Sequence, residues 1–210
     1  MKLKNINLLN LALSFFIGIG GLSLAKAEEA TAGLFVEPAI TYELGDGSVN
    51  YPSPLSNSSG TVKGFGLGAR LGFHLNEAFF VGLDARYAMP YFKDSSVNYS
   101  ANSVATNWGP VIGMQMPNIG MRLWASYILG GEMNPEKSGS FDVKFLNATG
   151  YRIGAGFRIA SLSLNIEYQQ LKYGTSRLEQ IGPFTGGTQF DNVNLNNNAW
   201  LASVSFPLAL

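Results

Sequence analysis

Residues 151–159, with the sequence Tyr-Arg-Ile-Gly-Ala-Gly-Phe-Arg-Ile, decide the fold class of this chain. Apolar side chains occupy the odd positions, from Tyr151 to Ile159, and only glycine or arginine occupies the even ones. A period of two is the pattern of a β-strand, because successive side chains point to opposite faces of the sheet. The stretch therefore predicts a strand with one apolar face and one face of small and charged residues.

The same alternation recurs along the chain on either side of this stretch. It predicts eight strands, at residues 33–44, 64–74, 79–91, 107–115, 122–129, 150–159, 162–169 and 200–210. The connections at residues 75–78, 116–120 and 160–161 are short, whereas those at 45–60, 93–105, 131–146 and 174–198 are long and polar. Short and long connections alternate, which indicates short turns at one end of the structure and long loops at the other.

The composition limits the function classes. Of the 210 residues 13% are charged, about half the share that is usual in soluble domains. The absence of cysteine excludes disulfides and Cys-ligated metal or iron–sulfur sites, and a formal net charge of zero argues against nucleic-acid binding. The loop aspartates also lack the spacing of metal ligands. We therefore expect no cofactor, no metal and no nucleic-acid partner.

Residues 1–27 have the three-part pattern of a secretory signal peptide. Lys2 and Lys4 precede an apolar run at residues 8–24, and a small-x-small tripeptide follows, so cleavage is expected after Ala27. An uncleaved anchor helix is the alternative, although Asn10 and Ser14 interrupt the run, which falls short of the roughly 20 residues that span a bilayer. Cleavage would remove three of the 14 basic residues and leave one domain, residues 28–210, with 11 basic and 14 acidic residues.

Loop length and face chemistry together predict a transmembrane barrel. Outer-membrane barrels have short periplasmic turns and longer extracellular loops, a segregation that a soluble sandwich does not require. The non-apolar face is small and glycine-rich, which suits a narrow interior better than a solvated exterior. Strands cross a bilayer only as a closed barrel. The prediction is an all-β fold, an eight-stranded antiparallel up-and-down transmembrane β-barrel with its apolar face toward lipid; a secreted soluble barrel is the alternative.

Three segments carry a resemblance to a known group: residues 63–73, 80–87 and 151–158, together with the terminal strand. In these features the chain resembles the small eight-stranded bacterial outer-membrane proteins typified by the OmpA membrane domain, OmpX and OmpW. The resemblance covers the chain from Thr31 to Leu210. It implies a Gram-negative outer-membrane location, contact with outer-membrane lipid, insertion by the outer-membrane assembly machinery and a monomeric state.

The charged residues of the predicted strands are segregated by face. Arginines fall on the inward face, whereas Lys63, Lys93, Lys137, Lys144 and Lys172 fall in loops or at strand ends. Acidic residues share the inward face, and the rigid fork of arginine suits paired carboxylates in a narrow lumen. We expect a charge network in two clusters, one of Glu37, Arg70, Asp84 and Arg86 and one of Arg152 and Glu167.

These features favour a structural or surface-interaction protein with a lumen plugged by ion pairs. A ligand outside the cell would bind the long loops, above all residues 174–198, where Ile181, Pro183, Phe184 and Phe190 lie among polar residues. A small gated pore, in which the same ion pairs break, is one alternative. OmpW-like transport of small hydrophobic molecules is another, for which Phe35, Phe80 and Trp124 are the only large apolar side chains expected inside.

A lipid-modifying enzyme is the least favoured alternative. Some eight-stranded outer-membrane barrels act on lipid A or phospholipid through a Ser, His and acidic set near the outer leaflet; a calcium-dependent or histidine-free mechanism is the other possibility. The one histidine, His74, falls at the periplasmic end of its strand with its side chain inward. The sequence therefore predicts no catalytic residues.

Overall fold

A computed structural model of the chain describes residues 32–53, 56–94, 99–116, 118–139, 141–181, 183–191 and 193–210. The expected signal peptide, residues 1–27, and therefore the expected domain boundary after Ala27, lie outside the described residues. Within the described part of the chain, no helix is long and apolar enough to cross a membrane.

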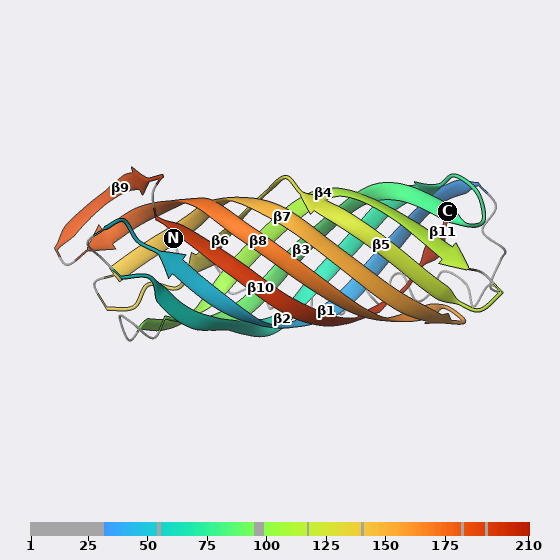
Figure 1. The fold of residues 1–210 in the computed structure, drawn as a ribbon, viewed down its shortest axis with the longest axis horizontal. Helices are drawn as coiled ribbons and strands as arrows, with labels where there is room; N and C mark the ends of the chain where they lie inside the picture. Colours follow the sequence, from blue (N-terminus) through green and yellow to red (C-terminus); the bar gives the residue numbers. More distant parts are fainter. Residues whose placement is uncertain are drawn as a thin grey trace, which may run out of the picture.

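Antiparallel strands form a closed wall (Figure 1). Its strands are β1 (Gly33–Asn50), β2 (Ser58–His74), β3 (Phe79–Asp94), β4 (Tyr99–Met116), β5 (Met121–Ile128), β6 (Gly130–Pro135), β7 (Phe141–Ile159), β8 (Leu162–Ile181), β9 (Phe184–Phe190), β10 (Asn194–Ser205) and β11 (Leu208–Ala209). β5 and β6 follow one another between β4 and β7, and β11 pairs with β1 beyond the end of β10. The wall is therefore eight strands around, as predicted, and β9 is an additional strand on the edge of β8.

The register fixes the width of the barrel. Paired residues followed once around the wall from Leu44 of β1, through β10, β8, β7, β5, β4, β3 and β2, return to β1 at Leu34. The barrel is therefore sheared by ten residues. A sheared eight-stranded barrel has strands tilted by about 40° and an interior just wide enough for side chains.

The strands are longer than predicted at the end that carries the long connections. The predicted loops 45–60, 93–105, 131–146 and 174–198 are mostly strand, and the connections there reduce to residues 51–57, 95–98, 136–140 and 191–193 plus the turn between β8 and β9. These extensions are rich in Ser, Asn and Gly, which have low strand propensity. The alternation also slips where the backbone has positive φ, at Gly131 and Asn147. The hydrogen-bonded pairing with neighbouring strands nevertheless continues through these extensions.

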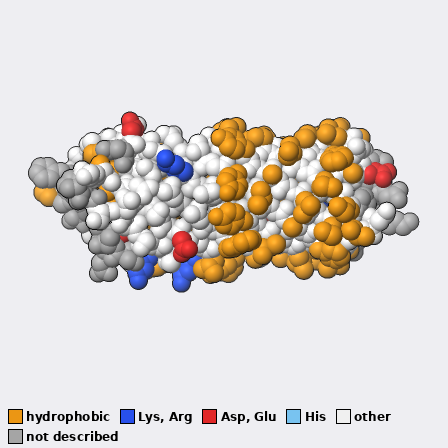
Figure 2. All heavy atoms as spheres, in the orientation of Figure 1, with side chains coloured by type: hydrophobic (Ala, Val, Ile, Leu, Met, Phe, Trp, Pro, Cys, Tyr) orange, Lys and Arg blue, Asp and Glu red, His pale blue; other side chains and the backbone are white. Residues whose placement is uncertain are grey.

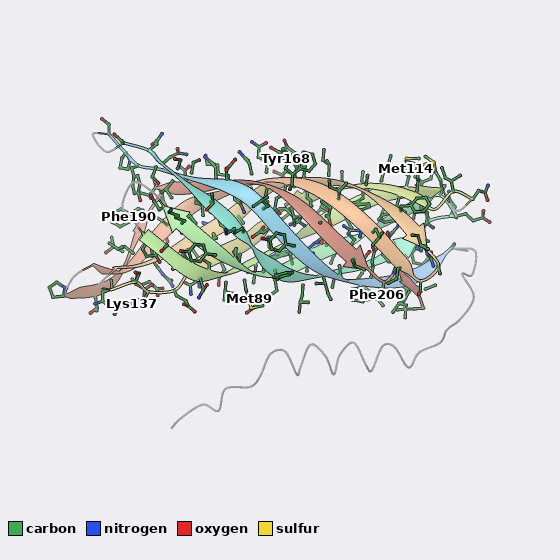
Figure 3. The ribbon with its side chains drawn as sticks, turned by 90° about the horizontal axis from the view of Figure 1, so that it is seen from below. Met89, Met114, Lys137, Tyr168, Phe190 and Phe206 are labelled. Atoms are coloured by element: carbon green, nitrogen blue, oxygen red, sulfur yellow. The ribbon has the colours of Figure 1, made fainter. Side chains whose placement is uncertain are left out.

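An apolar belt surrounds the half of the barrel that carries the short turns (Figure 2). In β1 it runs over the outward residues from Leu34 to Leu44. Ten residues at about 3.3 Å each, tilted by about 40°, cover about 25 Å along the barrel axis, which is the height of the apolar band of outer-membrane barrels. Figure 3 shows Met114 and Phe206 near one end of this half, and Lys137 and Phe190 at the far end of the other half.

A girdle of aromatic side chains closes the belt on its outer side. Each of the eight wall strands places one outward aromatic there: Tyr42, Phe65, Tyr87, Trp108, Tyr127, Tyr151, Tyr168 and Trp200. Neighbouring rings touch, with centroids 4.8 Å apart for Tyr42 and Phe65 and 5.2 Å apart for Tyr168 and Trp200. Amphipathic rings favour the boundary between hydrocarbon and water. We call the part of the barrel below this girdle the membrane half and the part beyond it the outer half.

Candidate functional site

Seven charged residues from six strands meet inside the membrane half. They are Glu37 of β1, Arg70 of β2, Asp84 and Arg86 of β3, Arg122 of β5, Arg152 of β7 and Glu167 of β8, each no more than 7% exposed. Glycines on the same face make room for large side chains. A Cβ at Gly68 would lie 3.0 Å from Cδ of Arg86, and one at Gly154 would lie 2.4 Å from Cε2 of Trp124. The glycine-rich inner face thus lets long side chains cross the lumen.

Glu37 anchors the side of this network that is nearer the short turns. Arg122 donates two hydrogen bonds to it, from Nη1 to Oε1 at 2.8 Å and from Nη2 to Oε2 at 2.7 Å. The hydroxyl of Ser205 donates to Oε1 at 2.6 Å. Arg70 approaches the same oxygen at 3.5 Å. The two-pronged geometry is the strongest form of an arginine–carboxylate contact.

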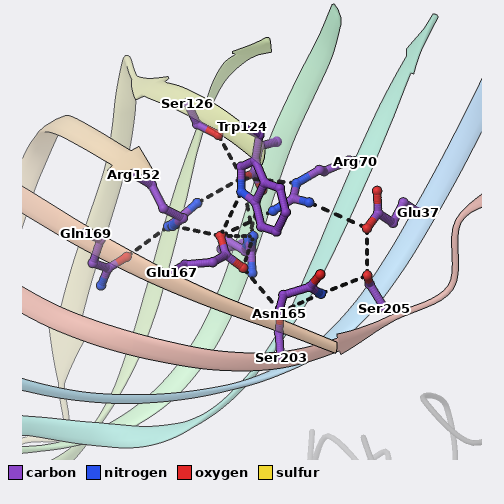
Figure 4. Close-up of polar contacts among 12 residues, drawn as sticks. Glu37, Arg70, Trp124, Ser126, Arg152, Asn165, Glu167, Gln169, Ser203 and Ser205 are labelled. Carbon is purple, nitrogen blue, oxygen red and sulfur yellow. Dashed lines mark hydrogen bonds and ion pairs between the residues drawn. The ribbon is translucent and has the colours of Figure 1, made fainter. Parts of the chain in front are cut away.

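Asp84 and Glu167 form the centre of the network, and Figure 4 shows Glu167 among its partners. Arg86 bridges them, with Nε 2.8 Å from Oδ1 of Asp84 and Nη2 2.9 Å from Oε2 of Glu167. Arg152 donates from Nη1 to Oδ2 of Asp84 at 3.1 Å. Arg70 reaches Glu167 at 3.2 Å. Each of these two carboxylates therefore contacts three guanidinium groups, because Arg70 Nε also lies 3.7 Å from Asp84 and Arg152 Nε 3.9 Å from Glu167.

Uncharged side chains complete the site. Arg70 stacks over the ring of Trp124, with its guanidinium carbon 4.2 Å from the centroid. Ser126 donates to Asp84 at 3.1 Å and Ser203 to Glu167 at 3.2 Å. Arg152 also donates to the side-chain oxygens of Asn107 at 2.8 Å and Gln169 at 3.0 Å. These contacts hold the charged groups in place from every side of the lumen.

The network differs from its prediction in two respects. All six predicted residues lie in it, but they form one cluster rather than two, because Arg70 contacts both Glu37 and Glu167. Arg122 was not among the predicted members, although it makes the shorter of the two ion pairs with Glu37. The strand around Arg122 carries large apolar side chains on both faces, so the alternation gave little guidance there. The inward face was readable from the sequence, whereas the partners across the lumen were not.

An aromatic plug lies below the network. Phe35, Phe80, Val111 and Trp124 form a buried cluster, with the rings of Phe35 and Phe80 5.6 Å apart and edge to face. His74 packs on it, with its ring 4.7 Å from that of Phe35. A Cβ at Gly113 would lie 2.2 Å from Phe80, so glycine is needed opposite this ring. His74 is therefore part of the plug, at the end away from the aromatic girdle, and no described group of His, Asp or Glu is arranged to hold a metal.

The lumen of the outer half is mainly apolar, with a few buried polar side chains such as Ser58 and Asp94, which are hydrogen-bonded at 2.8 Å. Its buried cluster draws on every wall strand: Val49, Val62, Phe92, Tyr99, Ala101, Ala105, Ile128, Met133, Val143, Phe145, Ala148, Leu171, Tyr173 and Leu195. Phe92 contacts the rings of both Tyr99 and Phe145, at 6.2 and 6.1 Å. The expectation that only Phe35, Phe80 and Trp124 are large apolar side chains inside the barrel is therefore wrong. Most of these residues lie in segments that the sequence indicated as loops.

Known structures share this architecture. No protein-family model and no curated protein matches the chain. The outer membrane protein OprG from Pseudomonas aeruginosa superposes with a TM-score of 0.54 at 10% identity, over 86% of this chain and 98% of that one. The outer membrane protein AlkL, solved in lipid bilayers, gives 0.52 at 12% identity, over 89% and 95%. This chain has the fold of the small outer-membrane β-barrel proteins.

The predicted fold class is thereby confirmed. The lipid-facing belt, the aromatic girdle and this fold agree with the expected outer-membrane location. Neisserial surface protein A is a further similar structure, at 14% identity and a TM-score of 0.46 over 85% of this chain and 99% of that one. At such identities the likeness concerns the fold, and the role of the barrel depends on its own lumen and surface.

Proposed function

We propose that the protein is a closed outer-membrane barrel that anchors a rigid outer half for interactions at the cell surface. The observation that carries this proposal is the ion-pair network, which joins Glu37 on one wall to Asp84 and Glu167 on the others through four arginines. An eight-stranded barrel is only wide enough for side chains. A lumen filled in this way at membrane level leaves no permanent channel.

The aromatic plug supports closure at a second level. Phe80 lies 5.5 Å from the guanidinium carbon of Arg122, so plug and network are in direct contact. Opening a path would therefore require both layers to move. Removing one partner of a buried ion pair costs about 3–5 kcal/mol, which indicates how strongly the native arrangement is favoured.

The outer half has the features of a surface for partners. Its lumen is packed with apolar side chains, so its strands are held rigidly beyond the girdle. Among the strands that the structure describes, β9 pairs only with β8, and residues 185–190 are exposed, with Phe190 at 38%. This strand lies inside the segment 174–198 that was expected to bind a ligand outside the cell. An exposed strand edge and an exposed aromatic are features that protein partners commonly use.

Conductance in planar bilayers tests the closed state. Wild-type protein should give at most small and intermittent currents, because the network and plug fill the lumen. Arg70→Ala removes the side chain that links Glu37 with Glu167 and should increase the frequency and size of these currents. Large steady currents from the wild type would refute closure.

A small gated pore is the second candidate. It is favoured by one observation, namely that side chains alone block the lumen at the network and the plug, so rotamer changes in both layers would open it without moving the wall. Voltage-dependent wild-type openings that disappear when the network is fixed by a Glu37–Arg122 cross-link would support this candidate over the closed anchor. Transport of small hydrophobic molecules is less favoured, because the apolar side chains of the outer half are packed on one another.

A further inference from the structure

The lipid-facing surface of β1, β2 and β3 carries an apolar groove. It has a volume of about 300 Å³ and opens on the outer wall. Five outward-facing side chains line it: Pro38, Leu67, Ala69, Ala85 and Tyr87. Gly68 and its register partners Ala39 and Arg86 form the floor. Pro38, Ala69 and Ala85 are register partners across three strands, so small side chains are adjacent there between larger ones. The groove lies within the membrane belt, just below the aromatic girdle.

Two lysines stand above this groove on the same strands. Lys63 lies two positions beyond the girdle residue Phe65 on β2, and it pairs in register with Tyr91 of β3. Lys93 is therefore its diagonal neighbour on the same face, where Cα atoms lie about 7–8 Å apart. Both side chains are exposed. Both were expected in loops or at strand ends. Lys63 instead lies within β2, next above the girdle, whereas Lys93 lies next to the end of β3, six residues beyond the girdle residue Tyr87.

Neither lysine has an anionic partner within the described part of the chain. The ion pairs beyond the girdle there involve Lys144 with Glu132 and Arg177 with Glu179. Asp46 of β1 lies on the same face, paired in register with Thr61, but forms no ion pair with either lysine. Two lysines and one carboxylate leave this patch with a net positive charge, which favours an anion, and the patch lies above the apolar groove in the membrane belt.

We propose that β1–β3 bind one molecule of the phosphorylated glycolipid of the outer leaflet, lipopolysaccharide, through its lipid A anchor. Its phosphates would contact Lys63 and Lys93, and one acyl chain would lie in the groove. Leu67 and Ala69 are four and six residues from Lys63, a distance of about 13–20 Å along the strand that a fatty acyl chain can span. Thr61 faces outward beside both lysines and can bind sugar hydroxyls. The proposal rests on the proposed function, in which the girdle end faces the cell exterior.

Native mass spectrometry of the folded full chain in detergent, titrated with bisphosphorylated lipid A, tests this site. Wild-type protein should bind one lipid A in preference to further copies. The double variant Lys63→Ser/Lys93→Ser should bind about tenfold more weakly, as expected for two exposed charge contacts. Ala69→Leu fills the groove without changing the charge and should weaken binding to a similar extent. Lys172→Ser, on β8 away from the groove of β1–β3, is the matched control and should bind as the wild type does.

Two results would overturn the site. One is equal affinity of all four proteins for lipid A, which would show that binding is spread over the belt. The other is equal affinity of the wild type for lipid A and for phosphatidylglycerol, which would show a general preference for anionic lipid. Heat-modifiable mobility on gels without boiling verifies that each variant is folded. If the wild type binds no lipid A but migrates as a folded barrel and shows the expected low conductance, the lipid site is refuted while the closed anchor stands. Failure of the two proposals can therefore be distinguished.

Discussion

The two halves of the barrel are built from the same strands with opposite distributions of polarity. In the membrane half charged side chains gather in the lumen beside an aromatic plug and the outward side chains are apolar, whereas in the outer half most inward side chains are apolar and most outward ones polar. The change happens on both faces at the aromatic girdle. In β8, for example, Gln169 is followed inward by Leu171, and Tyr168 is followed outward by Gln170. The solvent around each half, rather than the strand pattern, decides which face carries the apolar residues.

The comparison also separates two ways of filling a narrow barrel. Below the girdle the lumen is filled by directed contacts between guanidinium and carboxylate groups, and above it by close packing of aliphatic and aromatic side chains. Ion pairs in a low-dielectric interior depend on every partner being present. Apolar packing loses stability in proportion to the volume removed. Substitutions in the two halves should therefore lower the stability of the barrel for different reasons.

The largest effect is expected at Asp84. Asp84→Asn keeps the shape of the side chain but removes the negative charge that contacts Arg70, Arg86 and Arg152. Uncompensated buried cations should lower the free energy of unfolding by about 3–5 kcal/mol, measured by urea titration in phospholipid vesicles. Asp46→Asn, on the exposed outer surface, should change it by less than about 0.5 kcal/mol. Similar values for both variants would contradict a network that depends on all of its charges.

A leucine pair on β8 compares the two halves directly. Leu171 is 1% exposed inside the outer half, whereas Leu164 is 52% exposed on the lipid face of the membrane half. Leu171→Ala should cost about 2–4 kcal/mol, because it leaves a cavity in a packed core. Leu164→Ala should cost about 1 kcal/mol or less in vesicles, since lipid fills the space. If the order were reversed in the same urea titration, the outer half would not be a packed core.

Tyr99 of the outer half should titrate late. Burial, with Asp142 and Glu136 nearby, raises the pKa of Tyr99 to about 12, and its hydroxyl donates to the backbone oxygen of Glu136 at 2.7 Å. The folded state therefore holds this proton more tightly than the unfolded chain does. The resulting stabilisation is present below pH 10 and is lost as the pH rises through 12. Absorbance titrations of the wild type and of Tyr99→Phe should differ by one tyrosine transition near pH 12. A difference near pH 10 instead would mean that the outer half is open to water.

The smallest effect is expected for an ion pair outside the lumen. Lys144 and Glu132 lie 2.9 Å apart on the outer half, and the Glu132 side chain is 43% exposed. Lys144→Gln should change the free energy of unfolding by at most about 0.5 kcal/mol, because solvent screens the pair. The ratio of this value to that for Asp84→Asn measures how far environment, rather than distance, determines the strength of an ion pair in this molecule.

The membrane half was largely predictable from the sequence, and the outer half was not. Alternation between residues such as Ile153 and Gly154 is strict within the belt, because lipid tolerates no exposed polar side chain there. Beyond the girdle, Asn196 and Ser48 face water and lower the strand signal, and the positive φ at Gly131 and Asn147 interrupts its period. In the site, parity predicted which side chains face inward. It could not predict that Arg70 would join both carboxylate groups or that Arg122 would bind Glu37, since those contacts depend on the shear of the closed wall.

The polarity of the inner and outer faces changes at the same height, the aromatic girdle, and this determines how deeply the barrel is immersed in the membrane. Sinking the barrel by one strand repeat would bring Lys63, Asn198 and Gln170 into hydrocarbon, and raising it would expose the girdle and the apolar residues below it to water. A lysine carried toward the middle of the bilayer costs up to about 2–4 kcal/mol. Both displacements are therefore opposed, and the immersion depth is fixed within a few ångströms. The outer half stands at a constant height above the membrane, and with it the strand edge that β9 presents to the surroundings.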